Sequence, residues 1–215
     1  MKQGLLFDLD GTLVDSLPGI TASLNHALAG MGFATHGGLE VRRFIGNGSW
    51  MLAKRAAPRD SPDEVVAAVE LAFKAHYDLH WQEGTAPYPG VPEVLAELRG
   101  KGHPMAVLSN KPHPFTTVIV ERLFPGIAFD AVVGQKDGIP HKPDPAGALE
   151  IVRIFGLPPE DCVLIGDSTI DLETARNAGI RSVAVTWGYH DRAPLLEGGP
   201  EKLIDGVGEL PAALE

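Results

Sequence analysis

The chain has 215 residues and a formal net charge of −10 at pH 7, and 44% of its residues are hydrophobic. This length suffices for one large domain or for a core with a small insertion. The acidic balance argues against a nucleic-acid partner, which requires a basic surface. No apolar run approaches the roughly 20 residues that a membrane-spanning helix needs. We therefore expect neither nucleic-acid binding nor a membrane span.

Cysteine usage bears on the cellular compartment. The chain contains one cysteine, Cys162, which cannot form an internal disulfide. A single cysteine at the start of an apolar run is typical of a packed core thiol in a reducing compartment. We expect a cytoplasmic protein, either a monomer or a homodimer.

The first apolar run, at residues 5–8, predicts a strand that ends at Asp8, and Asp10 follows two residues later. Side chains at i and i+2 of a strand share one face, so both carboxylates are expected to project together into a crevice at the strand end. Two acids held this close need a cation or a shared proton. We interpret Asp8 as a nucleophile that stays ionised, its pKa lowered by Mg²⁺ and a lysine, and Asp10 as its acid/base partner.

The segment that follows, from 16 to 85, has helical patterns throughout, at 17–31, 39–44, 50–57 and 63–81. A helical insertion after the first strand cannot belong to the sheet. We expect a helical cap over residues 16–85 and a core formed by residues 1–15 and 86–215.

From residue 86 onward, short apolar runs alternate with helical patterns. Strands are expected at 105–109, 131–133, 163–166 and 182–185, and helices at 91–99, 115–123, 145–155 and 172–178. This alternation predicts an α/β fold, in which a Rossmann-like parallel sheet carries helices on both faces.

Polar groups stand at or near the ends of these strands. Ser109 and Asn110 offer hydrogen-bond donors, Lys142 offers an ammonium, and Asp167 offers a hard oxygen ligand for Mg²⁺, with Asp171 supporting it one helical turn later. Each pattern alone has an ordinary explanation as a turn, a helix cap or a Pro-rich loop. Their coincidence favours a phosphate-handling site.

These motifs resemble the haloacid dehalogenase superfamily of phosphohydrolases. The matching residues run from Asp8 to Thr12, over Ser109-Asn110, at Lys142, and from Gly166 to Asp171. The resemblance implies a helical cap of that superfamily's first class, Mg²⁺ as cofactor and an aspartyl-phosphate intermediate. It also implies that Gly11 and Thr12 bind phosphate with Ser109 and Asn110, and that the metal ligands are Asp8, the Asp10 backbone carbonyl and Asp167.

Three further segments resemble the phosphoglycolate phosphatase branch, at 110–115, 44–48 and 187–189. By that resemblance, Arg43, Gly46, Asn47 and Gly48 contact the substrate, although Arg43 could equally be a solvated charge at a helix end. The implied reaction is Mg²⁺-dependent hydrolysis of 2-phosphoglycolate, a small phosphorylated metabolite. Pyrophosphate or a sugar phosphate as substrate, and a β-phosphoglucomutase-like phosphomutase, remain alternatives.

Overall fold

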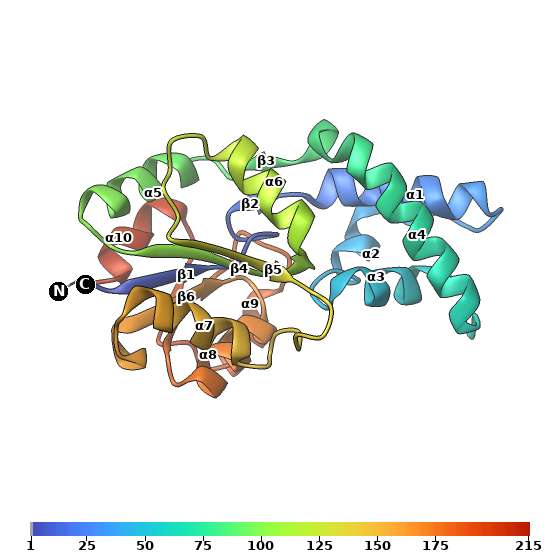
Figure 1. The fold of residues 1–215 in the computed structure, drawn as a ribbon. Helices are drawn as coiled ribbons and strands as arrows, with labels where there is room; N and C mark the ends of the chain where they lie inside the picture. The colour runs from blue at the N-terminus through green and yellow to red at the C-terminus, as the bar shows by residue number, and fades with distance from the viewer. Residues whose placement is uncertain (1) are drawn as a thin grey trace. The chain divides into compact units, whose positions relative to one another are not determined.

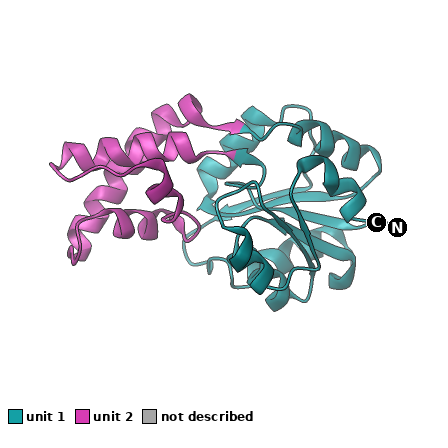
Figure 2. Ribbon diagram, turned by 180° about the vertical axis from the view of Figure 1, so that it is seen from behind, with its two compact units in different colours: residues 1–14, 87–215 teal, residues 15–86 magenta. Residues whose placement is uncertain are grey.

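A computed structural model describes residues 2–215. The chain forms two compact units (Figure 2): unit 1 contains residues 1–14 and 87–215, and unit 2 contains residues 15–86. The chain passes between them at β2 (Val14–Asp15) and β3 (Ala86–Pro87), two short strands that pair with each other. The function of unit 2 as a cap stays a prediction.

Unit 1 is built on a six-stranded sheet in the order β5-β4-β1-β6-β7-β8. Its strands are β1 (Gly4–Phe7), β4 (Met105–Pro112), β5 (Ala131–Gln135), β6 (Cys162–Gly166), β7 (Arg181–Val185) and β8 (Lys202–Ile204). All neighbouring strands run parallel. The prediction of an α/β fold with a parallel sheet is confirmed.

Helices cover both faces of this sheet (Figure 1), which explains why its central strands are continuously apolar. Leu6 and Leu164 belong to a buried cluster with α7 (Ala146–Phe155) and α8 (Thr169–Ala178). Phe7 and Ile165 line a small apolar cavity against α5 (Val91–Gly100) and α10 (Leu210–Ala213). Alternate residues of one strand therefore pack on opposite helical layers.

The remaining elements of unit 1 are shorter. Helix α6 (His113–Leu123) packs on β4 and β5, and α9 (Arg192–Glu197) packs against α8. Three-residue 3₁₀ turns precede β6 at η2 (Pro159–Asp161) and α10 at η3 (Val207–Glu209).

Unit 2 is helical. It contains α1 (Leu17–Gly30), α2 (Gly38–Arg42), α3 (Gly48–Ala56), α4 (Asp63–His80) and the 3₁₀ turn η1 (Trp81–Gly84). Its own core includes Leu24, Leu28, Val69, Phe73 and Trp81, each at most 5% exposed. Helices α1 and α4 pack lengthwise on each other.

The structure differs from the sequence-based elements at several places, and β2, β3, α9 and α10 had no predicted counterpart. Strand β4 continues to Pro112 rather than ending at 109, and β8 had no predicted counterpart because three residues carry no usable periodicity. Helix α8 begins at Thr169 rather than at 172, since Ser168 caps its first turn. These differences concern element ends or short elements, which local patterns specify least.

Candidate active site

The parallel sheet brings the carboxyl ends of its strands to one edge, and polar side chains gather there. Asp8 follows the last residue of β1 and Asp167 follows the last residue of β6, while Ser109, Asn110 and Lys111 lie within the long strand β4. All five are buried.

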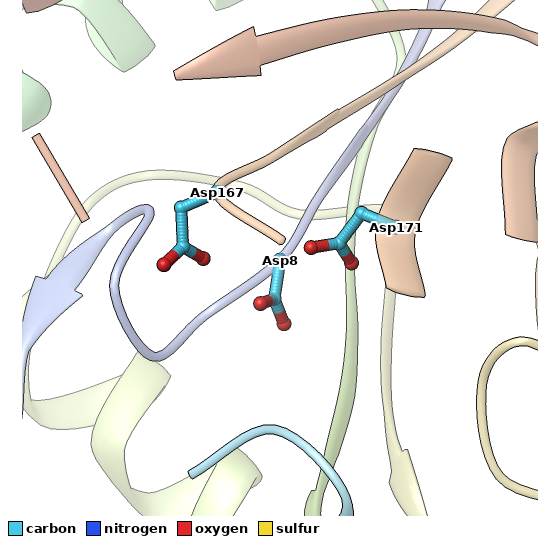
Figure 3. Close-up of side chains that lie close together, drawn as sticks. All are labelled: Asp8, Asp167 and Asp171. Atoms are coloured by element: carbon cyan, nitrogen blue, oxygen red, sulfur yellow. The ribbon is translucent and has the colours of Figure 1, made fainter. Parts of the chain in front are cut away.

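Three of the acids form one cluster (Figure 3). Carboxylate oxygens of Asp8, Asp167 and Asp171 lie within 4.8 Å of one another. Asp8 and Asp167 come from strand ends, and Asp171 comes from the first turn of α8 and directs its carboxylate toward Asp8. Such a cluster of buried acids is unfavourable unless cations or donors surround it.

Lys142 is the cation at this cluster. Its Nζ lies 2.8 Å from Oδ1 of Asp8 and 2.6 Å from Oδ1 of Asp171. It also donates to the carbonyl oxygen of Leu108 at 3.1 Å. An ammonium has three hydrogens, so these partners account for all of its donors.

The first turn of α8 holds Asp171 from the other side. Oδ2 of Asp171 accepts from the backbone N–H of Ser168 at 3.1 Å and from its hydroxyl at 2.6 Å. Ser168 is the N-cap of α8, and with Asp171 at the third position it forms a capping box. One pair of residues thus both begins the helix and orients a site carboxylate.

Burial dominates the acid–base properties of the cluster. It raises the pKa of Asp8 to about 7, because the loss of solvent outweighs the opposing attraction of Lys142. Burial, with the charges of Asp8 and Asp171, also raises the pKa of Asp167. For Lys142, burial disfavours the charge, but Asp171 and Asp8 outweigh it and raise the pKa.

The expected lowering of the Asp8 pKa requires Mg²⁺ together with the lysine and stays a prediction; without a bound ion, burial outweighs Lys142 and the pKa is raised. The structure places Lys142 next to Asp8, but one ammonium shared with Asp171 does not compensate for the burial of the Asp8 carboxyl group.

Asp10 lies in a separate ion pair. Nζ of Lys111 is 3.0 and 3.1 Å from the two carboxylate oxygens of Asp10, and the two side chains are 7% and 12% exposed. Strand β1 ends at Phe7, and the N–H of Asp8 still donates to the Ile165 carbonyl at 2.9 Å. Asp10 lies three residues beyond the strand in an isolated bridge with Val14. A different lysine binds each acid. That both carboxylates project into one crevice stays a prediction.

Asn110 positions the backbone of Lys142. Its side-chain N–H donates to the Lys142 carbonyl at 3.0 Å, and its side-chain oxygen accepts from the Lys142 N–H at 2.7 Å. The hydroxyl of Ser109 accepts from the backbone N–H of Lys111 at 3.2 Å. Phosphate binding by Ser109 and Asn110 stays a prediction, and the Asn110 amide already serves Lys142.

The carboxylate of Asp167 is enclosed by two loops. The Thr12 hydroxyl donates to Oδ1 at 3.2 Å, and the backbone N–H of Tyr189 donates to Oδ2 at 2.6 Å. Gly11 has φ +88°, and a Cβ there would collide with Asp167. A Cβ at Gly188 would collide with both Asp167 and the Gly11 carbonyl. Phosphate binding by Gly11 and Thr12 stays a prediction.

The four residues expected to contact substrate from the insertion belong to unit 2. Arg43 is the C-cap residue that follows α2, and it is exposed. Asn47 is the N-cap residue of α3, and its side-chain oxygen accepts from Nη2 of Arg55 at 2.7 Å. Gly46 and Gly48 flank it with φ +117° and +81°. Substrate contact by these residues stays a prediction.

The donor set of the acidic cluster fits a hard divalent cation. Three buried carboxylates with one ammonium among them leave excess negative charge, and carboxylate oxygens suit Mg²⁺. The Asp171 oxygens already accept hydrogen bonds from Lys142 and Ser168. Asp8 and Asp167 are therefore better suited to bind the ion, with Asp171 supporting them.

Sequence reasoning assigned no role to several residues that shape the site. Lys111 was noted only as part of a matching segment, although it stands two residues after Ser109 in β4. The indole N–H of Trp187 donates to the Thr12 carbonyl at 3.1 Å, and the Tyr189 N–H holds Asp167. The position of Lys111 at the carboxyl end of β4 could have indicated a role in the site. No local pattern in the sequence predicts the contacts of Trp187 and Tyr189.

Fold and site together define a class: an α/β enzyme with a carboxylate–lysine centre at the carboxyl edge of a parallel sheet. The model of the haloacid dehalogenase-like hydrolase family matches residues 5–185. The chain belongs to this family, which confirms the resemblance drawn from the four motifs.

Several proteins that are similar to this chain are named as phosphatases. It is 37% identical to phosphoglycolate phosphatase 1 of Pseudomonas aeruginosa, over 96% of this chain and 77% of that protein. It is 33% identical to a phosphoglycolate phosphatase of Pectobacterium atrosepticum, over 97% of this chain and 90% of the relative. A crystal structure from Lactobacillus delbrueckii subsp. bulgaricus, whose name also refers to phosphoglycolate phosphatase, matches with a TM-score of 0.93 and 34% identity, over 100% and 99% of the two chains.

Among the described residues, no helix combines the length and the apolar character needed to cross a membrane.

Proposed function

We propose that this hydrolase is a Mg²⁺-dependent phosphatase that converts 2-phosphoglycolate to glycolate and phosphate. The observation that carries the proposal is the buried cluster of Asp8, Asp167 and Asp171 around Lys142. The names of the relatives support the substrate.

Asp8 is the nucleophile in this proposal. Its carboxylate attacks the phosphorus atom in line and forms an aspartyl phosphate, while the P–O bond to the leaving alkoxide breaks. Lys142, which contacts Asp8, orients this carboxylate and favours its ionised form. A bound Mg²⁺ would supply positive charge that stabilises the phosphoryl group in the transition state.

Asp10 is the acid and base. It gives a proton to the leaving oxygen in the first step. A water molecule then attacks the phosphorus of the aspartyl phosphate, Asp10 takes the proton of that water, and phosphate leaves with Asp8 restored. Lys111 holds Asp10 through both carboxylate oxygens and so sets where the proton is given and taken.

The test is phosphate release from 2-phosphoglycolate, pyrophosphate and β-glucose 1-phosphate, each with and without Mg²⁺. We expect a Mg²⁺-dependent kcat/KM for phosphoglycolate at least about tenfold above the others, a difference of roughly 1.4 kcal/mol in transition-state binding. A preference for another ester would contradict the substrate and retain the aspartate chemistry. Retention of a sugar bisphosphate, with activation by it, would favour a phosphomutase.

The role of Asp10 is tested by Asp10→Asn. Positioned acid–base catalysis contributes about 10²- to 10⁴-fold, so we expect a loss of that size in kcat with an unchanged circular dichroism spectrum. An Asp10→Asn variant with more than half of the wild-type kcat would contradict this role.

A further inference from the structure

The two lysines of the site differ in their partners. Lys142 contacts Asp8, the proposed nucleophile, and its three donors are already used by Asp8, Asp171 and the Leu108 carbonyl. Lys111 contacts Asp10, the proposed proton donor to the leaving group, at 3.0 and 3.1 Å. In the proposed reaction, Lys142 therefore contacts the attacking carboxylate, and Lys111 contacts the acid that protonates the leaving oxygen.

The position of Lys111 relative to a substrate follows from the role of Asp10. A general acid must lie within about 3 Å of the oxygen that it protonates, so the Lys111 ammonium lies within roughly 6 Å of the leaving oxygen. What is bonded to that oxygen distinguishes one phosphomonoester from another. A carboxylate one carbon away from it is within reach of this ammonium.

Burial makes such a contact selective. The Lys111 side chain is 7% exposed, so solvent screens its charge weakly. A buried ammonium binds an anionic group more strongly than a neutral hydroxyl of similar size, because the charge-assisted hydrogen bond is the stronger one.

We propose that Lys111 is a specificity-determining residue that binds the carboxylate next to the leaving oxygen, selecting phosphorylated 2-hydroxy acids over neutral phosphomonoesters. This inference rests on the proposed function of the same site. It assigns the recognition of the substrate acid to strand β4 of unit 1.

The experiment compares 2-phosphoglycolate with 2-hydroxyethyl phosphate, which replaces the carboxylate by a hydroxymethyl group. Wild type, Lys111→Met, Lys111→Gln, Lys111→Arg and Lys101→Met are assayed with both esters, and circular dichroism checks folding. Lys111→Gln keeps a hydrogen-bond donor for Asp10 and removes the charge. Lys101→Met is the matched control, because Lys101 forms an exposed ion pair with Glu97.

We expect Lys111→Met and Lys111→Gln to reduce the preference for phosphoglycolate about 10- to 100-fold, the effect of one charged hydrogen bond, mainly through KM. Lys111→Arg should keep most of the preference, and Lys101→Met all of it. Equal losses for both esters, or a loss in kcat alone, would overturn the inference and show that Lys111 only positions Asp10. A wild-type enzyme with no preference for phosphoglycolate would contradict the proposed substrate itself, and the inference with it.

Discussion

Two lysines neutralise part of the negative charge of the site, and each makes two contacts with aspartate oxygens. Lys142 lies between Asp8 and Asp171, and Lys111 binds Asp10 through both oxygens. Asp167 is held by an O–H donor from Thr12 and an N–H donor from Tyr189 rather than by an ammonium of the described residues. The acidic cluster therefore carries the charge that a cation would balance.

The raised pKa values predict that cation binding depends on pH. A carboxyl group whose pKa is raised to about 7, as for Asp8, retains its proton near pH 6 and must lose it when a cation binds. We expect apparent Mg²⁺ affinity to increase between pH 6 and pH 8, by up to about tenfold per pH unit for each proton released. Calorimetric Mg²⁺ titrations at these pH values measure this directly.

The same shift has a consequence for stability. A folded-state pKa raised from 3.8 to about 7 means that the contribution of Asp8 to the stability of the ion-free protein is lost as pH rises from about 4 through 7. The lowered pKa values of His76, His113 and His141 act in the opposite direction below pH 7, so the contribution of Asp8 is measured as the difference between wild type and Asp8→Asn. Thermal unfolding of wild type and Asp8→Asn in EDTA between pH 4 and pH 8 measures this difference, and wild type should lose stability relative to Asp8→Asn as pH rises. A pH dependence that is the same for both proteins would contradict the burial of Asp8 as an acid.

The variant Gly188→Ala tests whether the loop around Gly188 holds the Asp167 carboxylate in place. A Cβ at this position would overlap the Asp167 side chain and the Gly11 carbonyl, so Gly188→Ala must displace one of them. We expect Mg²⁺ affinity to fall about 10- to 100-fold, as for other residues that orient metal ligands. Gly100→Ala is the control, since a Cβ there meets nothing within 4 Å. Unchanged Mg²⁺ affinity in Gly188→Ala would show that this loop does not constrain Asp167.

At the scale of elements, the carboxyl ends of β1, β4 and β6 and the first turn of α8 supply side chains of the site. Strand β4 continues past the expected end and thereby brings Lys111 to Asp10, while α8 begins early and brings Asp171 to Lys142. Element ends, which are the least predictable parts of the fold, therefore carry the site.

Helix α8 offers a test of this coupling. Ser168→Ala removes the hydroxyl that caps the helix and binds Asp171. We expect a loss of about 1–2 kcal/mol in the free energy of unfolding, the usual effect of an N-cap, together with weaker Mg²⁺ binding. Urea denaturation measures the first and calorimetry the second. Ser61→Ala, at an exposed turn, should change neither. A Ser168→Ala variant that loses stability but binds Mg²⁺ normally would separate the cap from the site.

At the scale of the whole molecule, the thiol of Cys162 reports on global unfolding. Cys162 lies in β6 with no exposed surface, and burial raises its pKa to about 11. A buried, protonated thiol reacts only when the structure opens. We expect labelling by a thiol reagent to be negligible in native protein and complete in guanidinium chloride. Rapid labelling of the native state, with the urea midpoint unchanged, would reveal local opening of the central sheet.

Much of the architecture was predictable because it is repetitive. The alternation of apolar runs and helical patterns predicted the parallel sheet, and the helical segment after the first strand predicted where the alternation breaks. Strand β8 escaped prediction because Lys202–Ile204 is too short to show a period. The end of β1 at Phe7 was set by a turn, which a strand pattern does not reveal.

The sequence by itself determined the fold class, the family and the positions of Asp8, Lys142 and Asp167, because strand ends and motif spacing are local properties of the chain. Only the tertiary structure decided that Lys111 binds Asp10, that Asn110 holds the backbone of Lys142, and that the Gly188 loop closes on Asp167. The hydrogen bonds that make these contacts join residues 101, 32 and 22 positions apart, namely Lys111 to Asp10, Lys142 to Asn110, and Tyr189 in the Gly188 loop to Asp167. The raised pKa of Asp8 has the same origin, since it depends on burial that no local pattern specifies.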